Sequence, residues 1–321
     1  MNNALTILWM LMGVAAGTLL PLQNTVNTRL AKGLRSIVLA TGVSFAVGTM
    51  FLGLVLLALR QHLPWDETFA RQPAWIWLGG LFGVSFFTVN IVLMRYFGAS
   101  ITVVLAICGQ VIGGLIIDVF GIFDVTRQSL SFGRLASTVL VVIGAILVNM
   151  TTHLHTDAHS DANDTARPRI VRRILLPVAG VLGGCLSAAQ TTVNGRLGTV
   201  LGSPEAASFA SFSVGVTCIA LFILVTIRSH THILATAAAL PWWAWAGGGV
   251  LGALYVLANA IDAPLLGTSL TVSVVLFGQI VGGLTIDHFG LLGLARRPVT
   301  TQRVIGAALV LIGIVLTRFA L

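Results

Sequence analysis

Residues 109–121 read GQVIGGLIIDVFG, and residues 278–290 read GQIVGGLTIDHFG. The two stretches are offset by 169 residues, and around them residues 90–123 align with residues 259–292 without a gap. Fourteen of those 34 positions are identical, and they include Asn, Gln, Gly and Asp in register. Because shared hydrophobicity alone would not repeat polar residues in register, the sequence indicates an internal duplication.

A second repeated stretch is polar inside an apolar chain. QNTVNTRL at residues 23–30 recurs as QTTVNGRL at residues 190–197, and SFAVGT at 44–49 recurs as SFSVGV at 211–216. Both pairs are offset by 167 residues, so a two-residue shift falls in the loop at 60–75. The duplication therefore covers most of each half.

The composition is that of an integral membrane protein. The chain is 56% hydrophobic and 9% charged, against roughly 25% charged in a soluble domain. The net charge of +8 comes from arginines that lie singly or in pairs between apolar runs, which is typical of topology anchors and not of nucleic-acid binding. The first ten residues carry no Lys or Arg, so the first apolar run is expected to be a retained span and not a signal peptide.

Apolar runs long enough to cross the bilayer as helices, about 20 residues each, predict an all-α membrane bundle. Ten such spans are expected, at 5–27, 36–59, 74–94, 100–118, 134–151, 174–193, 206–227, 241–260, 268–287 and 303–320. The cysteines, Cys108, Cys185 and Cys218, fall inside these runs without metal-ligand spacing, so they are interpreted as small buried hydrophobic residues.

The polar stretch at 152–173 is predicted to link two five-helix repeats, at 1–151 and 174–321. Its residues His153, His155 and His159, with Asp157 and Asp161, could hold a metal, but a solvated stretch of this composition is more often only a linker. No metal or cofactor is expected.

An odd number of spans in each half makes the second half enter the membrane in the opposite sense. This is an inverted-topology repeat, the plan of many secondary transporters. Twelve of the 18 Lys and Arg residues lie on the side of the 152–173 linker. The positive-inside rule then predicts a cytoplasmic linker and external termini in a multi-pass membrane protein.

Three motifs carry a family resemblance: Q-x-x-x-N-x-R-L, S-F-x-V-G and G-Q-x-x-G-G-L-x-I-D-x-F-G. Together they resemble the YdcZ-like family of the drug/metabolite transporter (DMT) superfamily, in its fused ten-helix form, over nearly the whole chain outside the linker. The resemblance implies an inner-membrane exporter without implying a substrate class. Pro21 stands opposite Ala188, and Arg95 opposite Pro264, so a strictly symmetric site is not expected. The matching residues are Gln23, Asn27, Arg29, Ser44, Phe45, Gly48, Gln110, Asp118 and Gly121, and Gln190, Asn194, Arg196, Ser211, Phe212, Gly215, Gln279, Asp287 and Gly290.

Amide side chains form the first group of candidate site residues. Gln23 and Asn27 share one helix face because they are four residues apart, and an amide in hydrocarbon needs a partner or a wet cavity. Interhelical hydrogen bonding and lining of a substrate path are both open interpretations. The substrate-cavity candidates are Gln23, Asn27, Gln190, Asn194, Gln110, Gln279, Asn90 and Asn259.

Acidic side chains form the second group. Asp118 and Asp287 end spans just before F-G turns, where they could bind loop amides or carry a proton for antiport. Asp262 lies deeper, with Leu93 as its counterpart, and is a further proton-coupling candidate. Arg29 and Arg196 end the octapeptides and are interpreted as snorkelling or structurally paired.

The sequence lacks the motifs of an ATP-driven or enzymatic protein. It has no G-x-x-x-x-G-K-[ST] phosphate loop, H-E-x-x-H, C-x-x-C or G-x-S-x-G. We therefore expect a secondary transporter, first of all an exporter, that moves a small organic metabolite or an amphipathic or cationic compound by alternating access. A facilitative importer or uniporter and a non-transporting scaffold or sensor are the alternatives. A monomer is compatible with the fused halves, and a homodimer is left open.

Overall fold

The computed structural model describes residues 3–61, 71–150, 174–226, 240–291 and 299–319, and every regular element within these ranges is a helix. The 152–173 linker, with its histidine cluster, lies outside the described residues. The helices are α1 (Asn3–Leu34), α2 (Ile37–Ala58), the 3-10 helix η1 (Ala74–Trp77), α4 (Gly79–Phe120), α5 (Phe132–Met150), α6 (Leu176–Leu201), α7 (Pro204–Thr226), α9 (Trp242–Leu266), α10 (Thr268–Phe289) and α11 (Thr301–Phe319).

These helices supply ten membrane crossings. Seven stretches are long and apolar enough to cross a membrane, and Gly79–Asn90, Phe132–Val148 and Thr301–Thr317 are shorter apolar segments. The predicted fold class, an all-α membrane protein of ten transmembrane helices in two inverted five-helix repeats, is confirmed.

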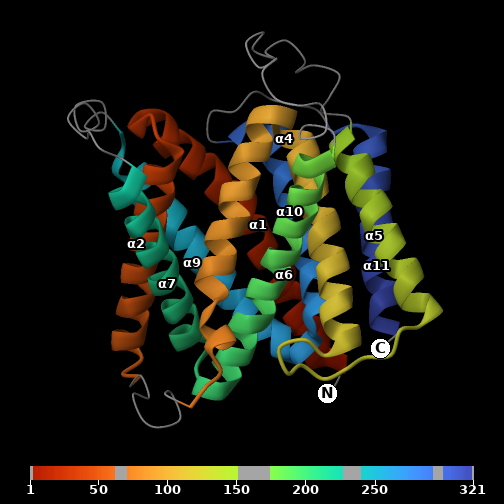
Figure 1. Cartoon of the computed structure of the whole chain (residues 1–321). Coiled ribbons are helices and arrows are strands. Elements are labelled where there is room, and N and C mark those ends of the chain that lie inside the picture. The colour runs from red at the N-terminus through yellow and green to blue at the C-terminus, as the bar shows by residue number, and fades with distance from the viewer. Residues whose placement is uncertain (1–2, 62–70, 151–173, 227–239, 292–298, 320–321) are drawn as a thin grey trace.

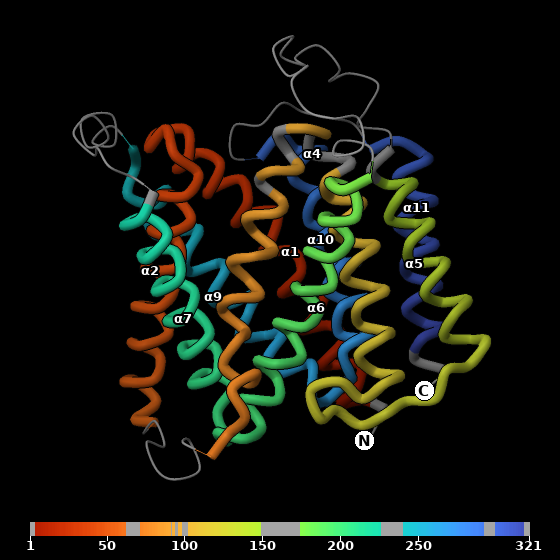
Figure 2. The backbone as a smooth tube through the Cα atoms, in the orientation of Figure 1, coloured from red at the N-terminus to blue at the C-terminus, as the bar shows by residue number. Residues whose placement is uncertain are grey.

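Helix α4 contains two of the crossings, although the sequence predicts separate spans at 74–94 and 100–118. A Cβ built on Gly180 would lie 2.7 Å from Leu93 Cδ1 and 3.0 Å from Leu105 Cβ. In a straight helix those two leucines would be about 18 Å apart along the axis. The helix therefore turns back on itself, and its two arms lie on either side of α6 (Figures 1 and 2).

The two halves run in opposite senses through the bundle (Figure 1). We call the end where α1 begins and α11 ends the terminal end, and the end where α5 ends and α6 begins the linker end. Helix α1 runs from the terminal end to the linker end, and its counterpart α6 runs back (Figure 2). Each packs against the other half: α1 against α9 and α10, and α6 against α4.

Two pairs of equivalent helices pack on each other and mark the pseudo-two-fold axis. They are α2 with α7, and α5 with α11. The Phe45 and Phe212 rings, which are equivalent residues, lie 5.1 Å apart between centroids. A Cβ on Gly144 would lie 2.5 Å from the Gly306 carbonyl oxygen, so α5 and α11 touch through their backbones.

The repeated F-G dipeptides end equivalent helices. Gly121 after α4 has φ +66°, and Gly290 after α10 has φ +64°. Each donates its N–H to the carbonyl four residues earlier, as in a left-handed helix cap. A third glycine, Gly267 with φ +81°, separates α9 from α10 and turns the chain at the terminal end.

Candidate substrate site

The amides of the first octapeptide lie against a glycine-rich face of α9. A Cβ on Gly252 would be 2.3 Å from Gln23 Nε2, and one on Gly248 would be 1.9 Å from Asn27 Oδ1. Ser44 Oγ of α2 also donates a hydrogen bond to Asn27 Oδ1. The amides therefore occupy space that any side chain at these glycines would fill.

The second octapeptide repeats this arrangement against the first arm of α4. A Cβ on Gly83 would be 2.5 Å from Gln190 Nε2, and one on Gly79 would be 2.0 Å from Asn194 Oδ1. Both polar atoms of the Asn194 side chain and Ser211 Oγ are buried without a hydrogen-bond partner among the described residues. The bond that joins Ser44 to Asn27 thus has no equivalent in the second half.

The glycines that receive the amides were missed by the sequence reasoning, although a signal existed. GGLFG at 79–83 and GGVLG at 248–252 recur at the same offset of 169 as the acidic motif. Each octapeptide therefore has its partner in the opposite half, and the two octapeptides are not partners of each other. The role of these amides as cavity lining stays a prediction.

The remaining amide candidates lie in α4, α9 and α10. Gln110 is 5% exposed, and Gln279 Nε2 is buried without a hydrogen-bond partner among the described residues. Asn90 and Asn259 each donate to the carbonyl of the preceding helical turn, at 2.8 Å. These two bonds satisfy one amide hydrogen of each asparagine within its own helix.

Asp118 joins the two halves at the terminal end. Its Oδ1 accepts from the Thr268 N–H at 3.1 Å, and its Oδ2 accepts from the Ser269 N–H at 2.8 Å. Arg134 Nη2 of α5 lies 3.4 Å from the same Oδ2, and both side chains are 2% exposed. A carboxylate at a helix N-terminus with a guanidinium beside it is a favourable arrangement, so Asp118 links α4 to the start of α10.

Asp287 has the equivalent arginine at the linker end. Arg303 Nη2 lies 2.8 Å from Asp287 Oδ2, and the Asp287 side chain is 27% exposed. Arg303 Nε also donates to the Val148 carbonyl at 3.3 Å, which connects α11 to the end of α5. The acid–arginine pair is therefore conserved between the halves while its burial differs.

Asp262 stands in a position that the other half fills with leucine. Its side chain is fully buried, and neither carboxyl oxygen has a hydrogen-bond partner among the described residues. A Cβ on Gly13 would lie 2.9 Å from Asp262 Oδ2, whereas the equivalent Gly180 faces Leu93. The chain thus places a carboxyl group where the pseudo-symmetric site is apolar.

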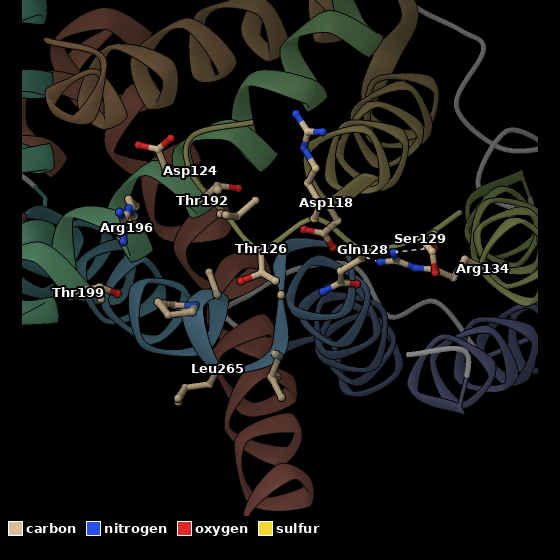
Figure 3. A pocket seen from close by; sticks show the side chains of 16 residues that line it. Asp118, Asp124, Thr126, Gln128, Ser129, Arg134, Thr192, Arg196, Thr199 and Leu265 are labelled. Carbon is tan, nitrogen blue, oxygen red and sulfur yellow. Dashed lines mark hydrogen bonds and ion pairs between the residues drawn. The ribbon is translucent and has the colours of Figure 1, made fainter. Parts of the chain in front are cut away.

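A pocket of about 620 Å³ opens between the halves at the terminal end (Figure 3). The first half contributes the end of α4, the 124–129 loop and Arg134, and the second contributes α6 and the 263–267 turn. Asp118 is the candidate site residue that lines it, and the eight amide candidates do not. The polar side chains of its wall include Asp118, Asp124, Gln128, Arg134, Thr192 and Arg196.

The described residues contain no cluster of three or more His, Cys, Asp or Glu side chains that could hold a metal ion. The predicted linker alternative, with His153, His155 and His159, falls outside them. The chemistry of the pocket is therefore that of arginine, carboxylate, amide and hydroxyl groups.

Comparison with known proteins gives matches to both halves. The family model described as "Putative inner membrane exporter, YdcZ" matches residues 8–147 and again residues 175–316. "Inner membrane protein YdcZ" of Escherichia coli (strain K12) is 30% identical over 148 residues, which are 46% of this chain and 97% of that protein. A solved crystal structure covers 99% of this chain and 98% of its own with a TM-score of 0.61 at 14% identity, which shows a shared fold.

Proposed function

The chain belongs to the YdcZ family of inner membrane exporters, and we propose that it exports a small organic molecule as a secondary transporter with alternating access. The observation that carries this proposal is the pocket between the two inverted halves. Inverted-repeat transporters bind their substrates between repeats and expose the site to one side at a time. A pocket that opens at the terminal end alone would be one of those two states.

The distribution of positive charge supports an orientation for this state. In the topology predicted from the sequence, twelve of the 18 Lys and Arg residues lie on the side of the 152–173 linker, so that side is proposed to be cytoplasmic. The pocket then opens to the outside, as expected after a substrate has been released by an exporter.

Proton exchange is proposed as the driving reaction, with Asp262 as the carrier. Asp118 and Asp287 each have an arginine partner, so a change in their protonation would break an ion pair. Asp262 has no such partner among the described residues, and its protonation can change without breaking a bond. The charged or titratable groups on the helices packed against α9 are Arg29, Lys32, Cys185, Arg196, Glu205, Cys218, Asp287 and His288, and none of them bonds to Asp262.

Flux measurements in proteoliposomes test the proposal. Cationic, amphipathic, anionic and amino-acid-like solutes would be compared with and without a pH gradient. Transport is expected for at least one class and is expected to depend on the gradient. If no solute moved under any gradient while Gln23→Ala/Gln190→Ala changed only stability, a non-transporting scaffold or sensor would be the better description.

The coupling residue is tested by comparing Asp262→Leu with Asp118→Asn and Asp287→Asn. Leucine fills the equivalent position in the first half, so Asp262→Leu should fold, and it should gain about 1–3 kcal/mol of stability by removing an unpartnered buried carboxyl group. We expect it to retain counterflow of substrate but to lose dependence on the pH gradient. Unchanged gradient dependence in all three variants would contradict these carboxylates as proton carriers. Transport by the parent protein without any gradient dependence would favour a uniporter.

A further inference from the structure

We propose that the pocket at the terminal end binds its ligand through a carboxylate, and that Arg196 supplies the cation. This inference rests on the proposed transport function, because it assigns the substrate class of the same pocket. It narrows the sequence-based expectation, which included cationic compounds, to small molecules that carry a carboxylate group.

Arg196 and its counterpart Arg29 differ in what they contact. The Arg29 guanidinium carbon lies 4.9 Å from the centroid of the Trp243 ring, within the range of a cation–π interaction. At the position equivalent to Trp243 the first half has Ala74, so Arg196 has no such aromatic ring. Arg196 is partly exposed, lines the pocket and makes no hydrogen bond or ion pair with a described residue.

The other buried charges of the pocket neutralise each other. Asp118 and Arg134 form an ion pair at 3.4 Å, and both oxygens of Asp118 accept backbone N–H groups. This pair lies on the opposite side of the pocket from Arg196 (Figure 3). Arg127 also lines the pocket but is exposed, so Arg196 is the partly buried cation of the wall that has no ion pair with a described residue.

The chemistry of a guanidinium favours a carboxylate over a neutral polar group. Its planar fork of N–H donors matches two carboxylate oxygens, and such charge-assisted bonds are the strong class of hydrogen bond. Around Arg196 the end of α9 adds an apolar surface made by Ala263, Pro264 and Leu265. A compact apolar body with one carboxylate therefore fits a pocket of about 620 Å³, a volume usual for small-molecule sites.

Asp124 bears on whether the ligand carries an ammonium group beside its carboxylate. It lines the same pocket, on the same side as Arg196 in the view of Figure 3, without forming an ion pair with it. Its loop is fixed because the preceding Phe123 packs against Trp75 and Phe82, at 5.3 Å and 6.2 Å between ring centroids. An ammonium group next to the carboxylate would meet Asp124, so the ligand is either a plain organic acid or an amino-acid-like zwitterion.

Ligand binding to the purified full-length protein in detergent tests the inference. The probes share one skeleton: cyclohexanecarboxylate, 1-aminocyclohexanecarboxylate and cyclohexylamine. We expect at least one of the two carboxylates to bind by calorimetry, and Arg196→Gln to weaken that binding about tenfold or more. Arg29→Gln is the matched control from the other half and should change affinity less than twofold.

The variant Asp124→Asn distinguishes a zwitterionic ligand from a plain organic acid. If the natural ligand is a zwitterion, Asp124→Asn should weaken binding of 1-aminocyclohexanecarboxylate and leave cyclohexanecarboxylate unaffected. If it is a plain acid, Asp124→Asn should leave or improve the binding of cyclohexanecarboxylate. Tight binding of cyclohexylamine with neither carboxylate bound, or equal losses for Arg196→Gln and Arg29→Gln, would overturn the inference.

Two further measurements distinguish a failure of the inference from misfolding and from a failure of the transport function. Arg196→Lys keeps the charge and should retain more binding than Arg196→Gln, and the unfolding temperatures of both variants should match the parent protein. If proteoliposomes move cyclohexylamine and Arg196→Gln leaves that flux unchanged, the inference is wrong while the transport function stands. If carboxylates bind through Arg196 but are not moved across the bilayer, the transport function is wrong while the inference stands.

Discussion

Identical residues at equivalent positions make different interactions in the two halves. Asn27 accepts a hydrogen bond from Ser44, whereas Asn194 and Ser211 are buried with no hydrogen-bond partner among the described residues. The octapeptide could be found from the sequence because its polarity is rare in an apolar chain. Its hydrogen bonding could not, since that depends on how closely two helices approach.

The asparagine pair gives a prediction at this scale. Asn27→Ala should lower the free energy of unfolding by about 1–3 kcal/mol, because Ser44 loses its acceptor in a buried place. Asn194→Ala, the matched variant, removes a group that has no partner and should cost less. Both would be measured by unfolding in mixed micelles, and an equal or larger loss for Asn194→Ala would show that Asn194 has a stabilising partner.

The buried ion pair gives a second residue-scale prediction. Asp118→Ala should destabilise the protein by about 3–5 kcal/mol, because Arg134 is then left buried and unpaired. Asp118→Ala/Arg134→Met should recover part of that loss, since the uncompensated charge is gone. Thermal unfolding of the two variants in detergent checks this, and no recovery in the double variant would place the loss in the missing α10 cap.

At the scale of the helices, glycines determine which pairs of helices approach to backbone contact. A Cβ on Gly109 would lie 1.9 Å from the Val181 carbonyl oxygen, and one on Gly278 would lie 2.0 Å from the Val14 carbonyl oxygen. Gly109 with Gly113, and Gly278 with Gly282, have the G-x-x-x-G spacing in the sequence that permits close helix approach, and the duplication repeats it. The reversal within α4 was predicted as a break between the spans at 74–94 and 100–118, where Gly98 is equivalent to Gly267. The continuation of helical structure through that reversal could not be predicted.

Two glycines of α10 test the importance of this approach. Gly278→Ala should lower stability by about 1–3 kcal/mol or prevent folding, because the new methyl group would overlap the α1 backbone. Gly283→Ala is the control on the same helix, since a Cβ there has no heavy atom within 4 Å. Yield of monodisperse protein and unfolding temperature are the measurements. Similar effects of both variants would point to a loss of helix flexibility instead of overlap.

Across the whole molecule, the inverted architecture was predictable, while the pocket was not. An odd number of spans in each repeat determines the inversion, and it is independent of side-chain contacts. The pocket is lined by the 124–129 loop and the end of α9, whose residues gave no repeated polar motif, and by α6, where Thr192 and Arg196 belong to the octapeptide. Asp118 was predicted as a site residue because it belongs to the duplicated motif at 109–121 and 278–290.

Membrane orientation gives the prediction at this scale. In a background with Cys108, Cys185 and Cys218 replaced by alanine, Thr126→Cys places an exposed thiol at the terminal end and Leu291→Cys places one at the linker end. An impermeant thiol reagent added to right-side-out vesicles should label Thr126→Cys and not Leu291→Cys. The reverse pattern would place the linker outside and make the pocket face the cytoplasm.

The exchange of partners between the halves has a consequence for biosynthesis. Helix α1 is synthesised before the helices it packs against most, α9 and α10, which follow more than 200 residues later. Until α9 is inserted, Gln23 and Asn27 lack the glycine surface that they pack against and are exposed to lipid or to another protein. Insertion of this chain is therefore expected to need a holding step at the translocon, and a ribosome stalled after α5 would leave a half that cannot complete its own packing.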